Sequence, residues 1–250
     1  MKLFSYGKHP KCSTALCLFE IDFQTFTKNF CEWWSELGNQ YDCFRINGQS
    51  WLEFFEQYDV FNPRYIITPT RAKWVVFFDN SVGGFIHWSV FRHMAERLKI
   101  RSVGILIDDN EVALTQNRPY GTQFMYADDR GQEPIDRTIS LIRDGKKWEF
   151  DQCGDPLPFE KTELYFNRKK ADRLSTALIS EYLACLGIDS ESEDFLIPEQ
   201  SLGIKKYIKP KTDEEVNALM QKLVDAANET LADTGKKMSA VHLSANFKNP

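Results

Sequence analysis

The polar side chains with the clearest chemical potential follow two apolar runs of the chain. Asp79-Asn80 comes directly after the run Trp74–Phe78, and Asp108-Asp109 comes directly after Val103–Ile107. Adjacent carboxylates suit Mg²⁺, which proteins hold through one or two carboxylates together with the phosphate oxygens of a substrate. A second acidic pair, Asp128-Asp129, has the same composition. Adjacent acids also mark the end of a strand and its turn, and we give this structural interpretation more weight.

His87 and Arg101 complete the candidate site. His87 falls between the two apolar runs, and Arg101 stands just before the second run. Ligands of open α/β sheets bind at the carboxyl ends of the strands, and a phosphorylated or nucleotide substrate would suit these residue types. The structural alternative is that an Asp or Asn here only holds its turn by bonding its own backbone. The candidate binding residues are Asp79, Asn80, His87, Arg101, Asp108 and Asp109.

Complete catalytic and cofactor motifs are absent from the sequence. It contains no GxSxG, HExxH, GxxxxGK[ST] or GxGxxG pattern, so no nucleophile elbow, zinc site or phosphate loop is expected. The six cysteines are scattered without a CxxC pair, which favours free thiols over a metal site or a disulfide framework. We therefore expect no cofactor, no metal and no enzymatic activity.

The two apolar runs and the segment between them predict a parallel unit. Both runs are too apolar for half-exposed strands, which favours central strands covered on both faces. Trp88, Phe91, Ala95 and Leu98 form one stripe of a helix over Ile86–Lys99. Strand, helix and strand in this order favour a right-handed parallel crossover. We expect this βαβ unit to lie at the centre of the sheet.

Local signals predict further elements around this unit. Residues 16–23 favour a strand over a helix, and apolar residues at steps of four, three and four predict a helix over Gln24–Leu37. Asp144-Gly145 is a preferred dipeptide of two-residue turns and predicts an antiparallel hairpin. Amphipathic stripes predict two more helices, over residues 167–186 and 212–232.

These elements together predict an α+β fold: a mixed β-sheet with a central parallel βαβ unit, an antiparallel hairpin and packed amphipathic helices. No linker rich in Gly, Ser or Pro interrupts the pattern. One domain over residues 1–250 is therefore expected, with any seam near residues 157–161 and a mobile tail after residue 236.

Composition and charge narrow the class of partner. The chain of 250 residues carries 36 acidic and 31 basic side chains, for a formal net charge of −5, and 14% of its residues are aromatic. An acidic surface repels phosphate backbones, so we expect no direct nucleic-acid binding, whereas a basic protein partner is favoured. No apolar run of about eighteen residues predicts a membrane span. The first residues lack the pattern of a signal peptide, so we expect a cytoplasmic protein.

Two stretches of the sequence share a pattern with other proteins. The first reads Trp74 … Phe78-Asp79-Asn80 … Gly83-Gly84, with a helix ending at Leu98 and then Arg101-Ser102-Val103. The second reads Trp148-x-Phe150 … Gly154 … Phe159-Glu160 … Tyr165-x-x-Arg168 … Leu186-Gly187-Ile188. Over residues 74–188 the chain resembles a set of small uncharacterised bacterial proteins with a strand and turn close to W-x-x-[YF]-F-D-N-G-x-x-G. It departs from them at Ser81, where they usually have Gly.

The resemblance implies a bacterial cytoplasmic protein of accessory type and carries no assigned chemistry. Immunity proteins are a common class of such proteins, and that step is an analogy. Our leading hypothesis is a non-catalytic, immunity- or antitoxin-like protein that occludes a cognate toxin through an acidic, aromatic-rich surface. One alternative is a structural or adaptor subunit of a larger bacterial assembly. The other is a metal-dependent enzyme that uses the strand-end carboxylates on a phosphorylated or nucleotide substrate.

Overall fold

The computed structural model describes residues 3–4, 14–46, 53–54, 63–80, 85–108, 120–144 and 147–207. All of them belong to one compact unit, Met1–Tyr207. The side chains of residues 14, 85–87, 108 and 144 lie outside the description. None of the described helices has the length and apolar character that crossing a bilayer requires.

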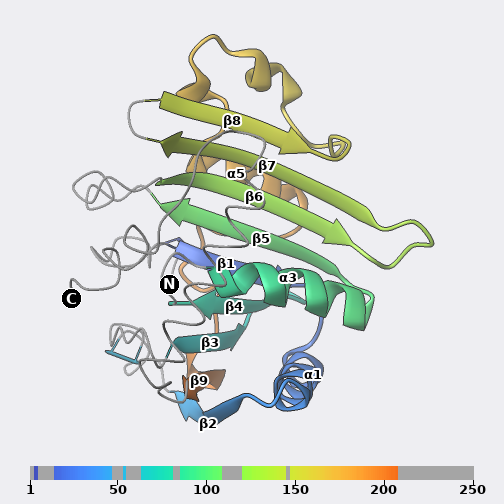
Figure 1. The fold of residues 1–250 in the computed structure, drawn as a ribbon, viewed down its shortest axis with the longest axis vertical. Coiled ribbons are helices and arrows are strands. Elements are labelled where there is room, and N and C mark those ends of the chain that lie inside the picture. Colours follow the sequence, from blue (N-terminus) through green and yellow to red (C-terminus); the bar gives the residue numbers. More distant parts are fainter. Residues whose placement is uncertain are drawn as a thin grey trace, which may run out of the picture. The chain divides into compact units, whose positions relative to one another are not determined.

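A single sheet of nine strands organises this unit, in the order β2-β9-β3-β4-β1-β5-β6-β7-β8 (Figure 1). Every pairing between these strands is antiparallel. The strands are β1 (Thr14–Phe19), β2 (Gln40–Ile46), β3 (Arg64–Pro69), β4 (Val75–Asp79), β5 (Arg101–Asp108), β6 (Tyr120–Asp128), β7 (Ile135–Asp144), β8 (Lys147–Cys153) and β9 (Ser201–Tyr207).

The predicted parallel βαβ unit is wrong, although its strand, helix and strand all form. They are β4, α3 (Phe85–Leu98) and β5, but β1 lies between the two strands and pairs antiparallel with both. Leu16 of β1 stands opposite Phe78 of β4 on one side and Ile105 of β5 on the other. A continuous apolar run shows that both faces of a strand are covered, and this is equally true of parallel and antiparallel neighbours. The sheet is therefore not mixed.

The connectivity β1-α1-β3-β4-α3-β5 follows a β-α-β-β-α-β pattern, with β2 as an extra strand after α1. In this pattern both helices lie on one face of the sheet, which we call the helix face. Helix α3 packs on β5, β1 and β4, and α1 (Phe23–Glu36) lies towards β3 (Figure 1). Rings fill this core, because Phe19 and Phe77 from the sheet meet Phe26 and Phe30 from α1.

Helix α1 agrees with its prediction to within one residue at each end. Asp22 caps it, with its carboxylate accepting a hydrogen bond from the Thr25 amide at 2.9 Å. Gly38, at φ +70°, ends it. The predicted hairpin is also present, since β7 and β8 pair antiparallel up to Asp144 opposite Lys147.

Residues 157–196, which we call the C-terminal cover, pack on the opposite face of the sheet. Their apolar side chains form one core with Leu16, Val76, Ile105 and Phe124. The predicted helix over residues 167–186 is shorter, because Ser175 caps α5 (Thr176–Cys185) and short 3₁₀ turns, η3 (Thr162–Phe166) and η4 (Lys170–Asp172), precede it. The predicted helix over 212–232 and the tail after 236 lie outside the described residues.

Candidate functional site

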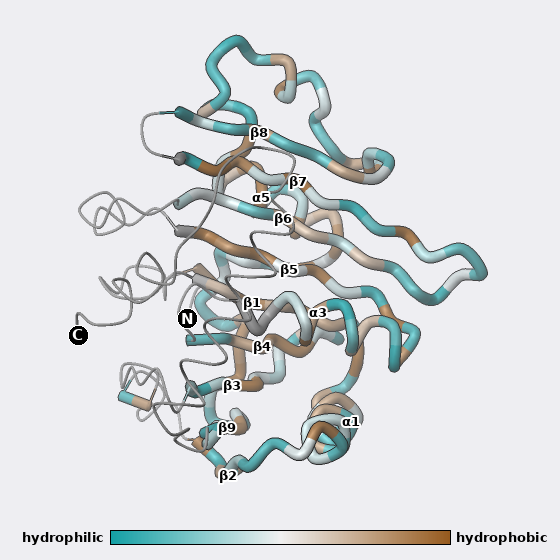
Figure 2. Tube along the Cα trace, viewed as in Figure 1, coloured by the Kyte–Doolittle hydropathy of each residue, from teal (hydrophilic) through white to brown (hydrophobic). Residues whose placement is uncertain are grey.

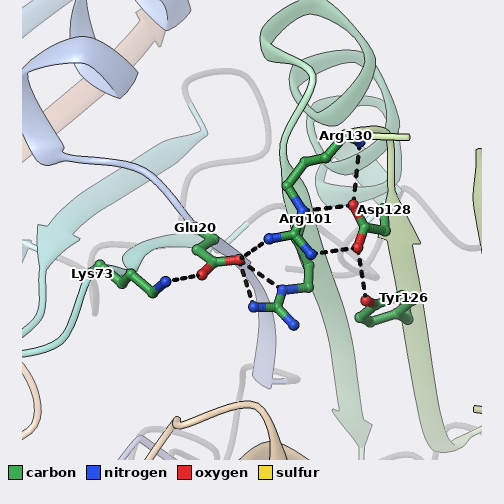
Figure 3. A network of polar contacts seen from close by, with 6 residues as sticks. All are labelled: Glu20, Lys73, Arg101, Tyr126, Asp128 and Arg130. Carbon is green, nitrogen blue, oxygen red and sulfur yellow. Dashed lines mark hydrogen bonds and ion pairs between the residues drawn. The ribbon is translucent and has the colours of Figure 1, made fainter. Parts of the chain in front are cut away.

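Charged side chains gather along one row of strand ends, where β1 and β6 end and where β4 and β5 begin. We call such a row of strand ends an edge of the sheet. Neighbouring antiparallel strands reverse direction, so these four strand ends meet at one edge. We call the group the edge network (Figure 3). Its members are Glu20, Lys73, Arg101, Tyr126, Asp128 and Arg130.

Glu20 is the centre of the edge network. Its side chain is 6% exposed and meets three cations. Arg101 donates through Nε and through Nη2, each at 2.7 Å, while Lys73 Nζ lies at 2.6 Å and Arg130 Nη1 at 3.3 Å. The Arg101 guanidinium also lies 5.6 Å from the centre of the buried Trp74 ring. One nearly buried carboxylate therefore links the ends of four strands, β1, β4, β5 and β6.

Asp128 completes the network and is held by Arg130. The Arg130 guanidinium donates twice to this carboxylate, at 2.8 and 2.7 Å, and the Tyr126 hydroxyl donates at 3.2 Å. These contacts take up both carboxylate oxygens, which leaves Asp128 in a structural ion pair.

Both carboxylates of the edge network ionise more readily than usual. Burial opposes ionisation of Glu20, but hydrogen bonds and charges of Lys73 and Arg101 outweigh it and lower its pKa. The hydrogen bonds and charge of Arg130 lower the pKa of Asp128 in the same way. A general acid at neutral pH needs a raised pKa, so this network is suited to holding the sheet rather than to proton transfer.

The sequence-predicted site residues are divided between two edges of the sheet. Arg101 begins β5 and Asp108 ends it, so roughly 23 Å of extended strand separates them. Asp79 ends β4, which runs in the same direction as β5, and therefore lies at the same edge as Asp108. His87 belongs to α3, but its side chain and that of Asp108 are not described, and Asp109 lies outside the described residues.

Asn80 bonds the backbone of the neighbouring strand β3, a different partner from the turn backbone that we considered. Its side chain accepts a hydrogen bond from the Arg64 amide at 2.9 Å, and its own amide donates to the Arg64 carbonyl at 3.3 Å. It thus ties the end of β4 to the start of β3. Asp79 is buried beside Cys17 and Tyr65, where burial first and then the Asp79 charge raise the pKa of both groups.

The two carboxylates of the acidic pair Asp128-Asp129 have different partners. Asp128 faces Glu20 and Arg130, whereas the buried Asp129 accepts from Arg92 at 3.0 Å. Arg92 also bonds Asp136 of β7 at 2.9 Å. Within the described ranges, no group of three His, Cys, Asp or Glu side chains could hold a metal ion.

A second polar cluster anchors the C-terminal cover and was not predicted. Arg137 and Glu160 form an ion pair whose side chains are 1% and 0% exposed, with bonds of 2.8 and 2.7 Å. The other N–H groups of the Arg137 guanidinium donate to the Gln152 side chain and to the carbonyls of Cys153 and Gly154. All five guanidinium donors therefore have an acceptor.

Glu160 is satisfied to the same degree. Besides Arg137 it accepts the Leu157 amide and the Tyr165 hydroxyl, each at 3.0 Å. The Tyr165 hydroxyl lies 3.0 Å from that of Tyr182, which accepts the Lys161 amide. This cluster fastens β7 and β8 to the cover, and since it has no exposed atom of Arg137 or Glu160 to offer a ligand, its role is structural.

No described helix covers the helix face of β7 and β8 (Figure 1). Met125 of β6 packs under α3, and the register places Thr138 of β7 and Cys153 of β8 beside it on the same face. Figure 1 shows α3 over the central strands and no described helix in front of β7 and β8, while α5 lies behind them. We call this surface the open face. Its residues are Asp136, Thr138, Ser140 and Ile142 of β7 with Lys147, Glu149, Asp151 and Cys153 of β8.

Acidic side chains predominate on the open face, and β8 is drawn as largely hydrophilic (Figure 2). Asp136 is paired with Arg92. Glu149 and Asp151 are exposed, and neither forms an ion pair with another residue of the described part. On the opposite face of the same strand, Trp148 and Phe150 pack against the core. The two acids therefore project from a strand that is fixed from behind.

The exposed aromatic side chains lie elsewhere. Phe44 and Tyr207 are 40% and 37% exposed, on β2 and β9, and Phe166 is 83% exposed at the end of η3. Among the described residues, the exposed acids of the open face therefore have no exposed large aromatic side chain beside them on β7 or β8, whereas Tyr207 of β9 donates a hydrogen bond to the exposed Asp42 of β2. The alternation of Lys147-Trp148-Glu149-Phe150-Asp151 was the signal in the sequence for the open face, because side chains of a strand alternate between its faces.

The chain matches no protein-family model, no curated protein and no solved structure.

Proposed function

We propose that the protein is a non-catalytic binding protein whose open face docks a basic protein, in the manner of an immunity protein that occludes a toxin. The observation that supports this is the pair Glu149 and Asp151, which are exposed on the open face and form no ion pair within the described part of the chain. Docked cations would replace their water.

A polar sheet face can simply face water, so its exposure alone does not indicate a binding surface. We therefore compare Glu149 and Asp151 with the other acids by whether each has an arginine partner. Near the same strands, Glu20, Asp128, Asp129 and Asp136 each have an arginine partner. Glu149 and Asp151 have no such partner among the described residues, which is also true of Glu133 and Asp155 in the neighbouring loops, but only Glu149 and Asp151 of these project from the open face. Acids left unneutralised on a rigid strand are preorganised for a cationic surface, which reduces the ordering cost of association.

The net charge of −5 supports the same class of partner. An acidic protein attracts a basic one over several ångströms, which raises the association rate and discriminates against acidic competitors. Toxins that attack nucleic acid are usually basic. The immunity-like role and the bacterial, cytoplasmic setting belong to the proposal and rest on analogy.

The two alternatives have less support in the described part of the chain. An adaptor role rested on the helix predicted over 212–232, which lies outside it. An enzyme using Arg101 together with Asp108 would need both ends of β5 at one site.

The test is affinity purification of the tagged full chain from its native host, with mass spectrometry of the bound proteins. We expect one stoichiometric basic protein, encoded by an adjacent gene and toxic when it is expressed without this chain. Purification of a monomer with no bound protein, from cells that express the neighbouring genes, would overturn the proposal.

A further inference from the structure

Two cysteine sulfurs lie in contact beside β2, at the opposite end of the strand order from β7 and β8. Cys31 Sγ on α1 and Cys43 Sγ on β2 are 3.9 Å apart. Cys43 stands opposite Ile204 of β9, whose side chain belongs to the core under α1, so Cys43 is on the helix face. Cys43 is exposed and Cys31 is half-buried, hence small reagents can reach the pair.

Hydrogen bonds hold the backbone around this pair. The Tyr41 hydroxyl of β2 donates to the Cys31 carbonyl at 2.9 Å, and the Ser35 hydroxyl donates to the same carbonyl at 2.9 Å. The Ser35 and Tyr41 hydroxyls are 3.0 Å apart. The end of α1 is thus fixed to the start of β2, and the two sulfurs meet as a result of the fold.

The two thiols are chemically unequal. A hydrogen bond with Cys43 is the main influence on Cys31 and lowers its pKa to about 7, against opposing effects of burial and of the Glu32 charge. The same hydrogen bond raises the pKa of Cys43, together with burial. The thiolate is the reactive form of cysteine, so Cys31 is the better nucleophile and Cys43 keeps its proton.

We propose that Cys31 and Cys43 are a redox-active dithiol that a peroxide converts into a disulfide between α1 and the edge strand β2. First, the Cys31 thiolate attacks one peroxide oxygen. The O–O bond breaks, the sulfur becomes a sulfenic acid and hydroxide leaves. Then the Cys43 sulfur attacks the sulfenic sulfur, so that the S–S bond forms and the S–O bond breaks. The departing hydroxyl takes the Cys43 proton and leaves as water, and the peroxide has accepted two electrons from the two thiols.

The other described cysteines differ from this pair, and Cys17 among them is buried. Cys153 and Cys185 are exposed free thiols, and no second thiol lies beside either of them in the described part of the chain. Sulfurs must approach to about 2.05 Å with side chains that point towards each other, and only a pair already in contact meets this requirement without rearranging the backbone. A disulfide here would close the loop between residues 31 and 43 and tie the outermost strand to α1.

The test is oxidation of the purified, reduced full chain with hydrogen peroxide, followed by peptide mapping. We expect a mass lower by two hydrogen atoms and a linked peptide pair that contains Cys31 and Cys43. At pH 7, about half of Cys31 should be thiolate, so we expect Cys31 to be the first cysteine that the peroxide oxidises. The mapping also covers Cys12, which lies outside the described residues.

Single variants separate the two roles. Cys43→Ser should leave a sulfenic acid at Cys31 that a dimedone probe captures, while Cys31→Ser should abolish the fast reaction. The matched control is the double variant Cys153→Ser with Cys185→Ser, which should still form the link. A link from Cys31 or Cys43 to another cysteine, or oxidation of Cys31 no faster than that of Cys153, would overturn the proposal.

Discussion

Arg137 and Glu160 illustrate what a buried charge requires in this molecule. Each side chain has a full set of partners, and each is almost completely removed from water. Removing one member of such a pair leaves the other uncompensated, which costs more than the pair itself contributes. This pair could not be predicted from the sequence, because the two residues are 23 positions apart and belong to different layers of the fold.

We predict that Arg137→Met and Glu160→Gln each lower the free energy of unfolding by about 3–5 kcal/mol. The double change Arg137→Met with Glu160→Gln should cost clearly less than the sum of the two single effects, since neither charge is then left alone. Urea unfolding of the four proteins measures this. Additive losses would contradict our account of the cluster.

Glu20 should make stability depend on pH. Its pKa in the folded protein is lowered from the ordinary value of 4.5, so the stability it contributes is fully present above that value and is lost as the pH falls through the folded pKa. Glu20→Gln should therefore cost about 2 kcal/mol at pH 7, and the gap to the wild type should narrow below about pH 4.5. Thermal unfolding from pH 7 to pH 3 tests this.

The control for Glu20 is Glu96→Gln, an exposed residue of α3 outside the edge network. It should change stability at pH 7 by less than about 0.5 kcal/mol. A gap between Glu20→Gln and the wild type that stays constant down to pH 3 would show that the edge network does not hold this carboxylate ionised.

At the scale of elements, local signals predicted α1 and the β7–β8 hairpin. The spacing of apolar residues, a glycine after the helix and the turn residues all involve positions close together in the sequence. Strand order was not predictable in this way. The insertion of β1 between β4 and β5 depends on pairings between distant residues, such as Leu16 with Phe78 and with Ile105. Any apolar strand could have filled that place. For the same reason Glu20 and Arg101, 81 positions apart, were not foreseen as partners.

The turn after β8 depends on Gly154. Its φ is +82°, and a Cβ there would overlap the backbone oxygen of Asp136. Gly187, after α5, has a similar φ of +76°, but a Cβ there would have no atom within 4 Å. We predict that Gly187→Ala costs about 1 kcal/mol of strain, whereas Gly154→Ala costs about 3 kcal/mol because the clash is added.

Thermal or urea unfolding of the two glycine variants decides between these effects. Similar losses of unfolding free energy in both variants would mean that only the positive φ matters, and that a Cβ at Gly154 does not clash with β7. A larger loss in Gly154→Ala would confirm that the turn after β8 packs closely on the backbone of β7, where the Gly154 carbonyl also accepts from Arg137.

At the scale of the whole molecule, the one sheet of the described residues has three surfaces that differ in what covers them. Helices α1 and α3 cover the centre of one face and the C-terminal cover packs on the other, while no described helix lies over the helix face of β7 and β8 (Figure 1), where Glu149 and Asp151 are exposed. Composition predicted an acidic surface but not its position, since only the register of β8 decides which residues face outward. The proposed function depends on that surface.

The most direct measurement compares three tagged proteins in one purification from the native host: the wild type, Glu149→Lys with Asp151→Lys, and Glu193→Lys with Glu199→Lys. Both double variants change the net charge equally at exposed positions, so both should keep the wild-type melting temperature to within a few degrees. We predict that the wild type and the Glu193/Glu199 variant retain the same basic partner, while reversal of the open face reduces its recovery at least about tenfold. Equal recovery on all three proteins, or a partner on none, would contradict the assignment of the open face as the docking surface.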